Sequence, residues 1–267
     1  MNLSDSLLLG LVQGITEFLP ISSTAHLRVV PALLGRGDPG AAITAVLQLG
    51  SLVAVIGFFL RDLIAMVRAV LGPDRATSPE ARRLLYMVVG TIPVGIAGLA
   101  FRHSIEGPLR SLTVIGTALI VVGLLMAVAD RFASGQRDVG DLTMRDALLI
   151  GLAQALALIP GVSRSGITLV AGMALGLRRD AAARFSFLLS VPAIGAAGVF
   201  ELPKVLHAPG LSAPALAAGL LTAAVSGYLS IAWLLRYLRT RATTPFVVYR
   251  VALGLLLIGG AAAGYLR

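Results

Sequence analysis

The chain has 267 residues, of which 57% are hydrophobic and only 13% are charged, and its mean hydropathy is +0.90. This composition excludes an ordinary soluble domain and indicates an integral membrane protein. The sequence contains no cysteine, which excludes disulfides and thiolate metal sites. The net charge of +9 comes from short loops beside apolar segments, where membrane orientation and anionic lipid explain it, so we expect no nucleic-acid partner.

The apolar segments predict an all-α polytopic membrane protein. In chain order, a broken segment at 6–33 precedes spans at 41–60, 84–101 and 112–129, and a second broken segment at 147–177 precedes spans at 185–201, 213–235 and 247–266. A transmembrane helix needs about 20 largely apolar residues. Pro and polar clusters interrupt the two broken segments, and such breaks are tolerated at membrane depth only inside protein or beside a water-filled cavity. We therefore expect six transmembrane helices plus two re-entrant helix pairs.

The distribution of basic residues predicts how the chain is oriented. Loops 61–83, 130–146, 178–184 and 236–241 hold 14 Lys and Arg residues, whereas 28–40, 102–110, 202–212 and the C-terminus hold 6. By the positive-inside rule, the first group of loops is cytoplasmic. The first re-entrant pair then enters from the outer side of the membrane and the second from the inner side.

The two halves of the chain predict an inverted repeat within a single membrane domain of residues 1–267. Repeat one covers about 1–135 and repeat two about 142–267, and an odd number of spans in each half turns the second upside down. Matching residues lie 141 positions apart: Gly10 and Gly151, Gln13 and Gln154, Ser22 and Ser163, Gly35 and Gly176, and Phe59 and Phe200. The alternative is a chance similarity between apolar stretches. Inverted repeats with broken helices place their site near the midplane, where Glu17 and Arg164 would meet.

Glu17 is the only carboxylate committed to an apolar interior. Gln13 precedes it by four residues, so the two share one face of a helix and could hold one ligand together. An ionisable group at membrane depth is expensive and by default indicates a functional site. The alternative is a structural role, either as an ion pair with Arg164 or as a partner for a broken helix end.

Ser22, Ser23 and Thr24 follow Pro20 and are good N-cap residues for a second half-helix. A helix N-terminus attracts anions such as phosphate, although most such clusters only satisfy the backbone. His26 follows Ser23 by three residues, so the two side chains could exchange a proton directly or through water. A buried histidine is otherwise more often a core residue than a catalyst.

The segment from Pro160 to Thr168 is the more specific signal. Glycines on both sides of Arg164 let the backbone approach a ligand, and the guanidinium fork suits phosphate oxygens. Ser163, Ser165 and Thr168 add hydroxyl groups around it. The alternative, in which Arg164 reaches to the membrane surface, fits poorly with its position in mid-segment. Mg²⁺ uses few carboxylates together with substrate phosphates, so Glu17 is the expected metal ligand. These residues predict a phosphate or pyrophosphate group held inside a membrane cavity.

These motifs resemble those of the undecaprenyl-diphosphate phosphatase family, the bacitracin-resistance type of membrane phosphatase. The family pattern of Glu or Gln, three residues, then Glu is met by Gln13 and Glu17, and its Pro-x-Ser-Ser-Thr-x-His run by Pro20 to His26. The Pro-Gly-x-Ser-Arg-Ser-x-x-Thr run is met by 160–168, and the stretch 47–51 is also similar to family members. Two departures are Gln13, which leaves Glu17 as the sole motif carboxylate, and Ala25, which stands where Gly is usual.

The resemblance implies cleavage of undecaprenyl diphosphate, a polyprenyl diphosphate lipid, to the monophosphate and inorganic phosphate. This reaction recycles the lipid carrier for peptidoglycan and other envelope polymers and confers bacitracin resistance. The resemblance also implies a multi-pass protein of the bacterial cytoplasmic membrane, a site open to the outer face, a divalent cation such as Mg²⁺ or Ca²⁺, and a homodimer.

For the mechanism, we expect Arg164 and half-helix N–H groups to hold the terminal phosphate. Ser23 is the expected nucleophile, and His26 is its base or the acid for the leaving lipid phosphate. Within the same reaction, His26 or water are alternative nucleophiles. A secondary transporter or flippase of a lipid phosphate or other anion is the main competing function, because inverted repeats with broken helices are typical of that class. A structural membrane protein without chemistry is a third interpretation.

Overall fold

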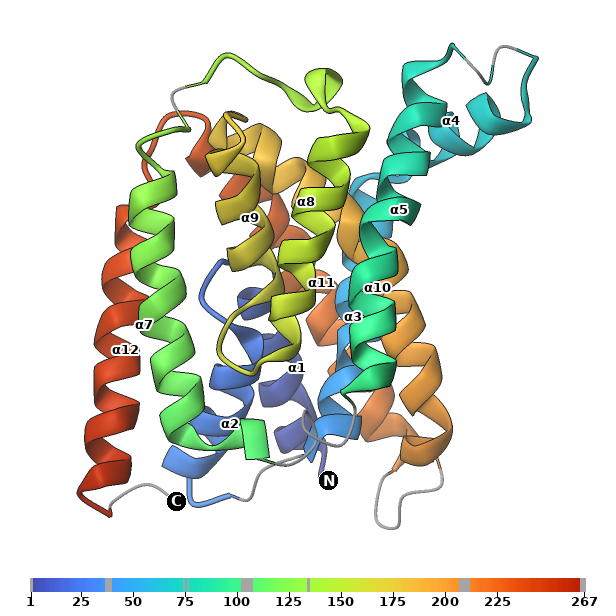
Figure 1. Ribbon diagram of the computed structural model, residues 1–267. Helices are drawn as coiled ribbons and strands as arrows, with labels where there is room; N and C mark the ends of the chain where they lie inside the picture. The colour runs from blue at the N-terminus through green and yellow to red at the C-terminus, as the bar shows by residue number, and fades with distance from the viewer. Residues whose placement is uncertain are drawn as a thin grey trace.

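The computed structural model describes residues 2–36, 40–73, 75, 77–101, 108–133, 135–206 and 212–264. All regular elements in these ranges are helical, apart from an isolated β-bridge between Arg137 and Leu177. The helices run in the following order: α1 Leu3–Phe18, α2 Ser23–Leu33, α3 Gly40–Phe58, α4 Leu60–Leu71, α5 Pro79–Ala100, η1 Pro108–Arg110, α7 Leu112–Ala129, η2 Val139–Asp141, α8 Met144–Ala155, η3 Leu156–Leu158, α9 Arg164–Ala174, α10 Arg179–Leu206, α11 Ala213–Leu238 and α12 Thr244–Ala262 (Figure 1).

The prediction of an all-α polytopic membrane protein is confirmed. In the described ranges, five helices are long and apolar enough to cross a membrane, namely α5, α7, α10, α11 and α12, and a sixth span is formed if α3 and α4 are counted together. These two helices are bent by 75° at Phe59. Each of the six predicted spans therefore falls on a helix, with 41–60 falling on α3.

The prediction that 61–83 is a loop is wrong for its first half. Residues Leu60–Leu71 form helix α4 at one end of the molecule (Figure 1). Leu60, Ile64, Val67 and Leu71 recur at helical spacing and are all exposed. Helix α4 was not predicted because its 12 residues are too few to span a bilayer, and the helices were predicted from apolar segments of spanning length.

Both predicted breaks are present, and each has the same backbone geometry. α1 ends at Phe18 and α2 begins at Ser23, while α8 ends at Ala155 and η3 leads to a turn before α9. The cap residues Ser22 and Ser163 both adopt positive φ, at 75° and 71°, which is uncommon for non-glycine residues. Each hydroxyl accepts a hydrogen bond from a backbone N–H of the next helix, at Ala25 and Gly166. α1 and α2 extend from the end that carries the N-terminus, and α8 and α9 from the opposite end (Figure 1).

Close glycine contacts hold the two broken segments against long helices. α1 packs on α11, where a Cβ on Gly10 would lie 2.2 Å from the carbonyl oxygen of Gly219. α8 packs on α5, where a Cβ on Gly151 would lie 2.4 Å from the carbonyl oxygen of Gly90. Since Gly10 and Gly151 are 141 residues apart, equivalent positions of the two halves make equivalent contacts with the opposite half.

Arg250 of α12 joins the two breaks. Its side chain is fully buried, and its Nη1 and Nη2 groups donate to the carbonyls of Pro20 in the first break and of Gly161 and Val162 in the second, each at 3.0 Å. Longer hydrogen bonds, of 3.2 and 3.4 Å, reach the carbonyls of Leu119 and Ala118 in α7. Arg250 is not among the predicted site residues, although an arginine inside an apolar span itself indicates a functional role.

Ion pairs and hydrogen bonds connect the loops that the charge distribution assigned to one side. Arg179 pairs with Asp130 at 2.5 Å, and Arg184 pairs with Asp62 at 2.7 Å. The backbone N–H of Thr243 donates to Asp130, which adds the loop between α11 and α12. The predicted grouping of loops 61–83, 130–146, 178–184 and 236–241 at one end is therefore confirmed for their described residues (Figure 1).

We predict that Gly151→Ala lowers the free energy of unfolding by about 2 kcal/mol or more, because the new methyl group would collide with the Gly90 backbone. Thermal unfolding of the purified protein in detergent measures the change. Gly95→Ala in α5 is the matched control, since no atom beyond its own helix backbone and chain neighbours lies within 4 Å of its added Cβ. Equal stability of Gly151→Ala and the wild type would contradict the close approach of α8 to α5.

We also predict that Arg250→Lys lowers the free energy of unfolding by about 3 kcal/mol, because a lysine keeps the charge but leaves several buried carbonyls without donors. The measurement is again thermal unfolding in detergent. Arg239→Lys, at an exposed position, controls for the chemical change itself. If the two variants unfold at the same temperature, Arg250 does not hold the breaks together.

Candidate functional site

A polar cavity of about 180 Å³ lies between the two breaks. Both broken segments contribute to its wall, together with α3, α5 and α10. Its polar lining residues are Glu17, Ser23, Thr24, Gln48, Gln154, Ser163 and Arg164, and its apolar ones are Val94, Ala157, Leu158, Ala193, Ile194 and Ala197. The cavity therefore combines the ionisable residues that the sequence singled out with a hydrocarbon-like wall.

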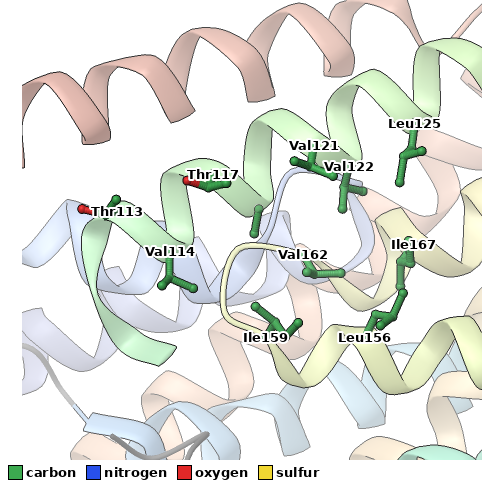
Figure 2. Close-up of a pocket in the computed structure, with 11 residues that line it drawn as sticks. Thr113, Val114, Thr117, Val121, Val122, Leu125, Leu156, Ile159, Val162 and Ile167 are labelled. Atoms are coloured by element: carbon green, nitrogen blue, oxygen red, sulfur yellow. The ribbon is translucent and has the colours of Figure 1, made fainter. Parts of the chain in front are cut away.

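A larger hollow on the other side of the second break is almost entirely apolar. It measures about 400 Å³, and Figure 2 shows side chains of α7, η3 and α9 lining it without any ionisable group. Ile159 and Val162 face this hollow, whereas the neighbouring Leu158 and Ser163 face the polar cavity. The second break thus separates an apolar surface from a polar one, and an ionisable residue from each broken segment lines the smaller, polar cavity.

Glu17 lies at the centre of the polar cavity's hydrogen bonds. Its Oε2 atom accepts from Gln13 Nε2 at 2.9 Å and from the Ser23 hydroxyl at 2.7 Å. Its Oε1 atom accepts from Arg164 Nη2 at 3.1 Å, so the predicted meeting of residues from the two halves occurs. The shared face of Gln13 and Glu17 is also found, although Gln13 is fully buried and does not line the cavity.

Ser23 and His26 are not hydrogen-bonded to each other in this conformation. The Ser23 hydroxyl donates to Glu17, while His26 Nδ1 lies 2.7 Å from the Ser22 carbonyl. A carbonyl only accepts, so Nδ1 carries the proton, and in the neutral ring Nε2 accepts from the Tyr249 hydroxyl at 2.6 Å. Of the two routes predicted from their spacing, a direct contact between Ser23 and His26 is therefore absent, and the carboxylate that accepts from Ser23 is Glu17.

The other hydroxyl groups of the two motifs divide into cavity and scaffold positions. Ser163 lines the cavity and also caps α9 through Gly166, while Thr24 lines the cavity from α2. Ser165 donates to the carbonyl of Leu19, and Thr168 donates to that of Arg164. Ser22, Ser165 and Thr168, expected to bind substrate, do not line the cavity; they contact backbone groups of the two segments, and Ser165 and Thr168 also contact the hydroxyls of Ser163 and Ser186.

Two helix N-termini and a guanidinium make the cavity suitable for an anion. The first turns of α2 and α9 both reach it, through Ser23 and Thr24 and through Arg164. Helix N-termini present N–H groups and a positive dipole end, which favour phosphate. Arg164 also donates from Nη1 to the Ser186 carbonyl at 3.1 Å, which fixes the plane of its guanidinium.

The cavity also has oxygen ligands suited to a hard divalent cation. Among the described residues, no group of three or more His, Cys, Asp or Glu could hold a metal ion. The Glu17 carboxylate is present, and the buried Oε1 of Gln154 has no hydrogen-bond partner. One carboxylate with neutral oxygens fits Mg²⁺, which retains waters and binds substrate phosphates.

Sequence reasoning missed several residues that surround the site. Gln48 and Gln154 line the cavity, Tyr249 contacts His26, Ser186 contacts Arg164, and Arg250 holds both breaks. Gln154 carried a signal, since it matches Gln13 at the 141-residue offset. Tyr249 and Ser186 lie in apolar helices far from both motifs, where only the tertiary structure reveals their contacts.

Comparisons with known proteins match this chain over almost its whole length. The family model described as bacitracin resistance protein BacA matches residues 6–256. An undecaprenyl-diphosphatase of Myxococcus xanthus is 54% identical over 263 residues, which cover 97% of this chain and 89% of that protein. Undecaprenyl-diphosphatases of Synechococcus elongatus and a Nocardioides species are 50% and 51% identical, over 100% and 94% of this chain and 96% and 93% of their own lengths. The chain therefore belongs to the BacA family of bacitracin resistance proteins.

Proposed function

We propose that this protein cleaves undecaprenyl diphosphate to undecaprenyl phosphate and inorganic phosphate, which recycles the lipid carrier for peptidoglycan and other envelope polymers and confers bacitracin resistance. The observation that carries this function is the meeting of Glu17 and Arg164 in a buried cavity at two helix N-termini. Family relatives named undecaprenyl-diphosphatase support the choice of substrate. The apolar wall at Val94, Leu158 and Ile194 suits the hydrocarbon next to the diphosphate.

In this proposal, Arg164 and the N-termini of α2 and α9 bind the terminal phosphate. The phosphate competes with Glu17 for the guanidinium, so one charged partner replaces another and Arg164 stays paired. When bound, a divalent cation such as Mg²⁺ or Ca²⁺, held by Glu17, supplies charge neutralisation for the diphosphate. The buried, water-poor surroundings strengthen each of these electrostatic interactions.

Ser23 is the proposed nucleophile. Its Oγ atom forms a bond to the terminal phosphorus, the phosphoanhydride bond breaks, and the lipid monophosphate leaves; water then releases inorganic phosphate from Ser23. Glu17 accepts the Ser23 hydrogen bond in this structure and is positioned to take the proton. His26 could serve as the base, or as the acid for the leaving phosphate, only after its Nε2 leaves Tyr249. Attack by His26 or by water remains an alternative within the same reaction.

We further propose that the chain is one membrane domain of two inverted-topology repeats, about 1–135 and 142–267, with α1–α2 and α8–α9 as re-entrant pairs beside six transmembrane helices. The equivalent glycine contacts of Gly10 and Gly151 support this arrangement. The positive φ of Ser22 and Ser163 supports it as well. Both observations favour a repeat over a chance similarity of two apolar stretches.

The orientation and assembly follow from the same proposal. The end that holds loops 61–83, 130–146, 178–184 and 236–241 faces the cytoplasm, because these loops carry the arginine excess. The site then opens to the outer face of the bacterial cytoplasmic membrane, and the family resemblance implies a homodimer. Its partners are the polyprenyl diphosphate and the bilayer, without nucleic acid.

Transport or flipping of a lipid phosphate is the second candidate, favoured by the paired helix breaks around a central cavity. Binding and transport could use every residue of the site. Hydrolysis is favoured because Ser23 already donates to a carboxylate beside the anion-binding groups.

We predict that the purified protein in detergent releases phosphate from a polyprenyl diphosphate, and that EDTA stops the release. Glu17→Ala and Arg164→Ala should abolish activity. Arg164→Lys should lose about 100-fold, because lysine keeps the charge but not the two-pronged donor geometry. Arg239→Lys, at an exposed loop position, should retain wild-type activity. No phosphate release by well-folded wild type would exclude hydrolysis and favour transport. Full activity of Arg164→Lys would exclude two-pronged binding of the phosphate by the Arg164 guanidinium.

A double-mutant cycle separates the structural contribution of the Glu17–Arg164 pair from its chemistry. Glu17→Gln or Arg164→Met alone should lower the free energy of unfolding by about 3 kcal/mol, since each leaves a buried partner unpaired. The double variant should cost clearly less than the sum of the two. The same cycle on the exposed pair Arg178 and Asp138 should give a coupling below about 1 kcal/mol. Additive effects at Glu17 and Arg164 would show that the ion pair does not form in solution.

A further inference from the structure

Gln154 is a buried cavity residue with one unused hydrogen-bonding atom. It lies near the end of α8 and is fully buried, yet it lines the same cavity as Glu17. Its Nε2 donates to the carbonyl of Gly90 in α5 at 3.2 Å, whereas its Oε1 has no partner. A buried acceptor left unpaired costs about 1–3 kcal/mol. A ligand that supplies positive charge to this atom would therefore be favoured.

The orientation of the Gln154 amide follows from its surroundings. The oxygen and nitrogen of an amide are assigned from their hydrogen bonds. The Gly90 carbonyl only accepts, so the amide nitrogen must face it, and a flipped side chain would bring two acceptors together. Gly90 does not line the cavity. Oε1 is thus the Gln154 atom left for a cavity ligand.

The chemistry of the cavity identifies that ligand. Because the described residues include no cluster of three acidic or histidine side chains, a cation at Glu17 must complete its shell with neutral oxygens and ligand phosphates. We propose that Gln154 Oε1 is a second protein ligand, beside the Glu17 carboxylate, for the divalent cation. This inference rests on the proposed function, which puts a cation at Glu17.

The competing arrangement involves Arg164. Its Nε atom is also buried without a hydrogen-bond partner, and both residues line the cavity, so a hydrogen bond from Nε to Gln154 Oε1 is the alternative. In that case Gln154 would orient the Arg164 guanidinium, and its removal would not change the affinity for a cation. Cation binding without substrate separates the two arrangements.

The experiment measures Mn²⁺ binding to the full-length protein in detergent, from the electron paramagnetic resonance signal of free Mn²⁺. Gln154→Leu removes Oε1, whereas Gln154→Glu keeps an oxygen in its place; both remove the donor to Gly90. We expect Gln154→Leu to weaken Mn²⁺ binding by about tenfold or more, and Gln154→Glu to bind at least as tightly as the wild type. Gln136→Leu, in a loop away from the cavity, makes the same chemical change and should leave binding unchanged.

Equal Mn²⁺ affinity of the wild type and Gln154→Leu would overturn the proposal. Equally weakened Mn²⁺ binding in Gln154→Leu and Gln154→Glu would also overturn it, because loss of the hydrogen bond to Gly90 would then explain the effect. Thermal unfolding without metal checks that both variants are folded. The proposed function fails separately: if the expected Mn²⁺ pattern is found but the wild type releases no phosphate, the cation site stands and hydrolysis does not. Phosphate release by a wild type that binds no Mn²⁺ would support hydrolysis and overturn the cation site.

Discussion

The rest of the site depends on the hydrogen bonds that the buried guanidinium of Arg250 donates. A helix broken at membrane depth leaves carbonyls without partners, and hydrocarbon offers no water to satisfy them. Arg250 donates to carbonyls of both breaks and of α7 from one side chain. It therefore sets the distance between the two breaks, and the pairing of Glu17 with Arg164 requires that distance.

Arg250 is held mainly by backbone dipoles. Within the described part of the chain, its side chain is fully buried and donates its hydrogen bonds to carbonyl oxygens. Burying a charge in this way is expensive, and a planar guanidinium with five donors can recover more of the cost than a lysine. Because Arg250 is satisfied by the backbone, the Glu17 carboxylate stays available for Arg164. Arg250 therefore stabilises the two breaks, whereas Arg164 is left to bind a ligand in the cavity.

The sequence allowed the spans, the two breaks and the meeting of Glu17 with Arg164 to be predicted, because apolar length, prolines and polar clusters are local signals. Helix α4 was missed because its amphipathic pattern is shorter than a span. The hydrogen-bond partners of Ser23 and His26 could not be predicted, for a different reason. Spacing along a helix does not reveal competition from Glu17 or from Tyr249, which lies 223 residues away from His26. Contacts of that kind depend on tertiary packing alone.

The proposed repeat explains why the site needs two unlike halves. At the 141-residue offset, Glu17 corresponds to Leu158, Ser23 to Arg164 and His26 to Ile167, whereas the scaffold positions Gly10 and Gly151 stay the same. Glu17, Leu158, Ser23 and Arg164 all line the cavity. Two copies of the first half would give two facing carboxylates without a guanidinium to bind phosphate, and two copies of the second would give two desolvated arginines without a counter-charge. A phosphate site at the repeat interface therefore requires the halves to differ at the chemical positions and to agree at the positions that bring them together.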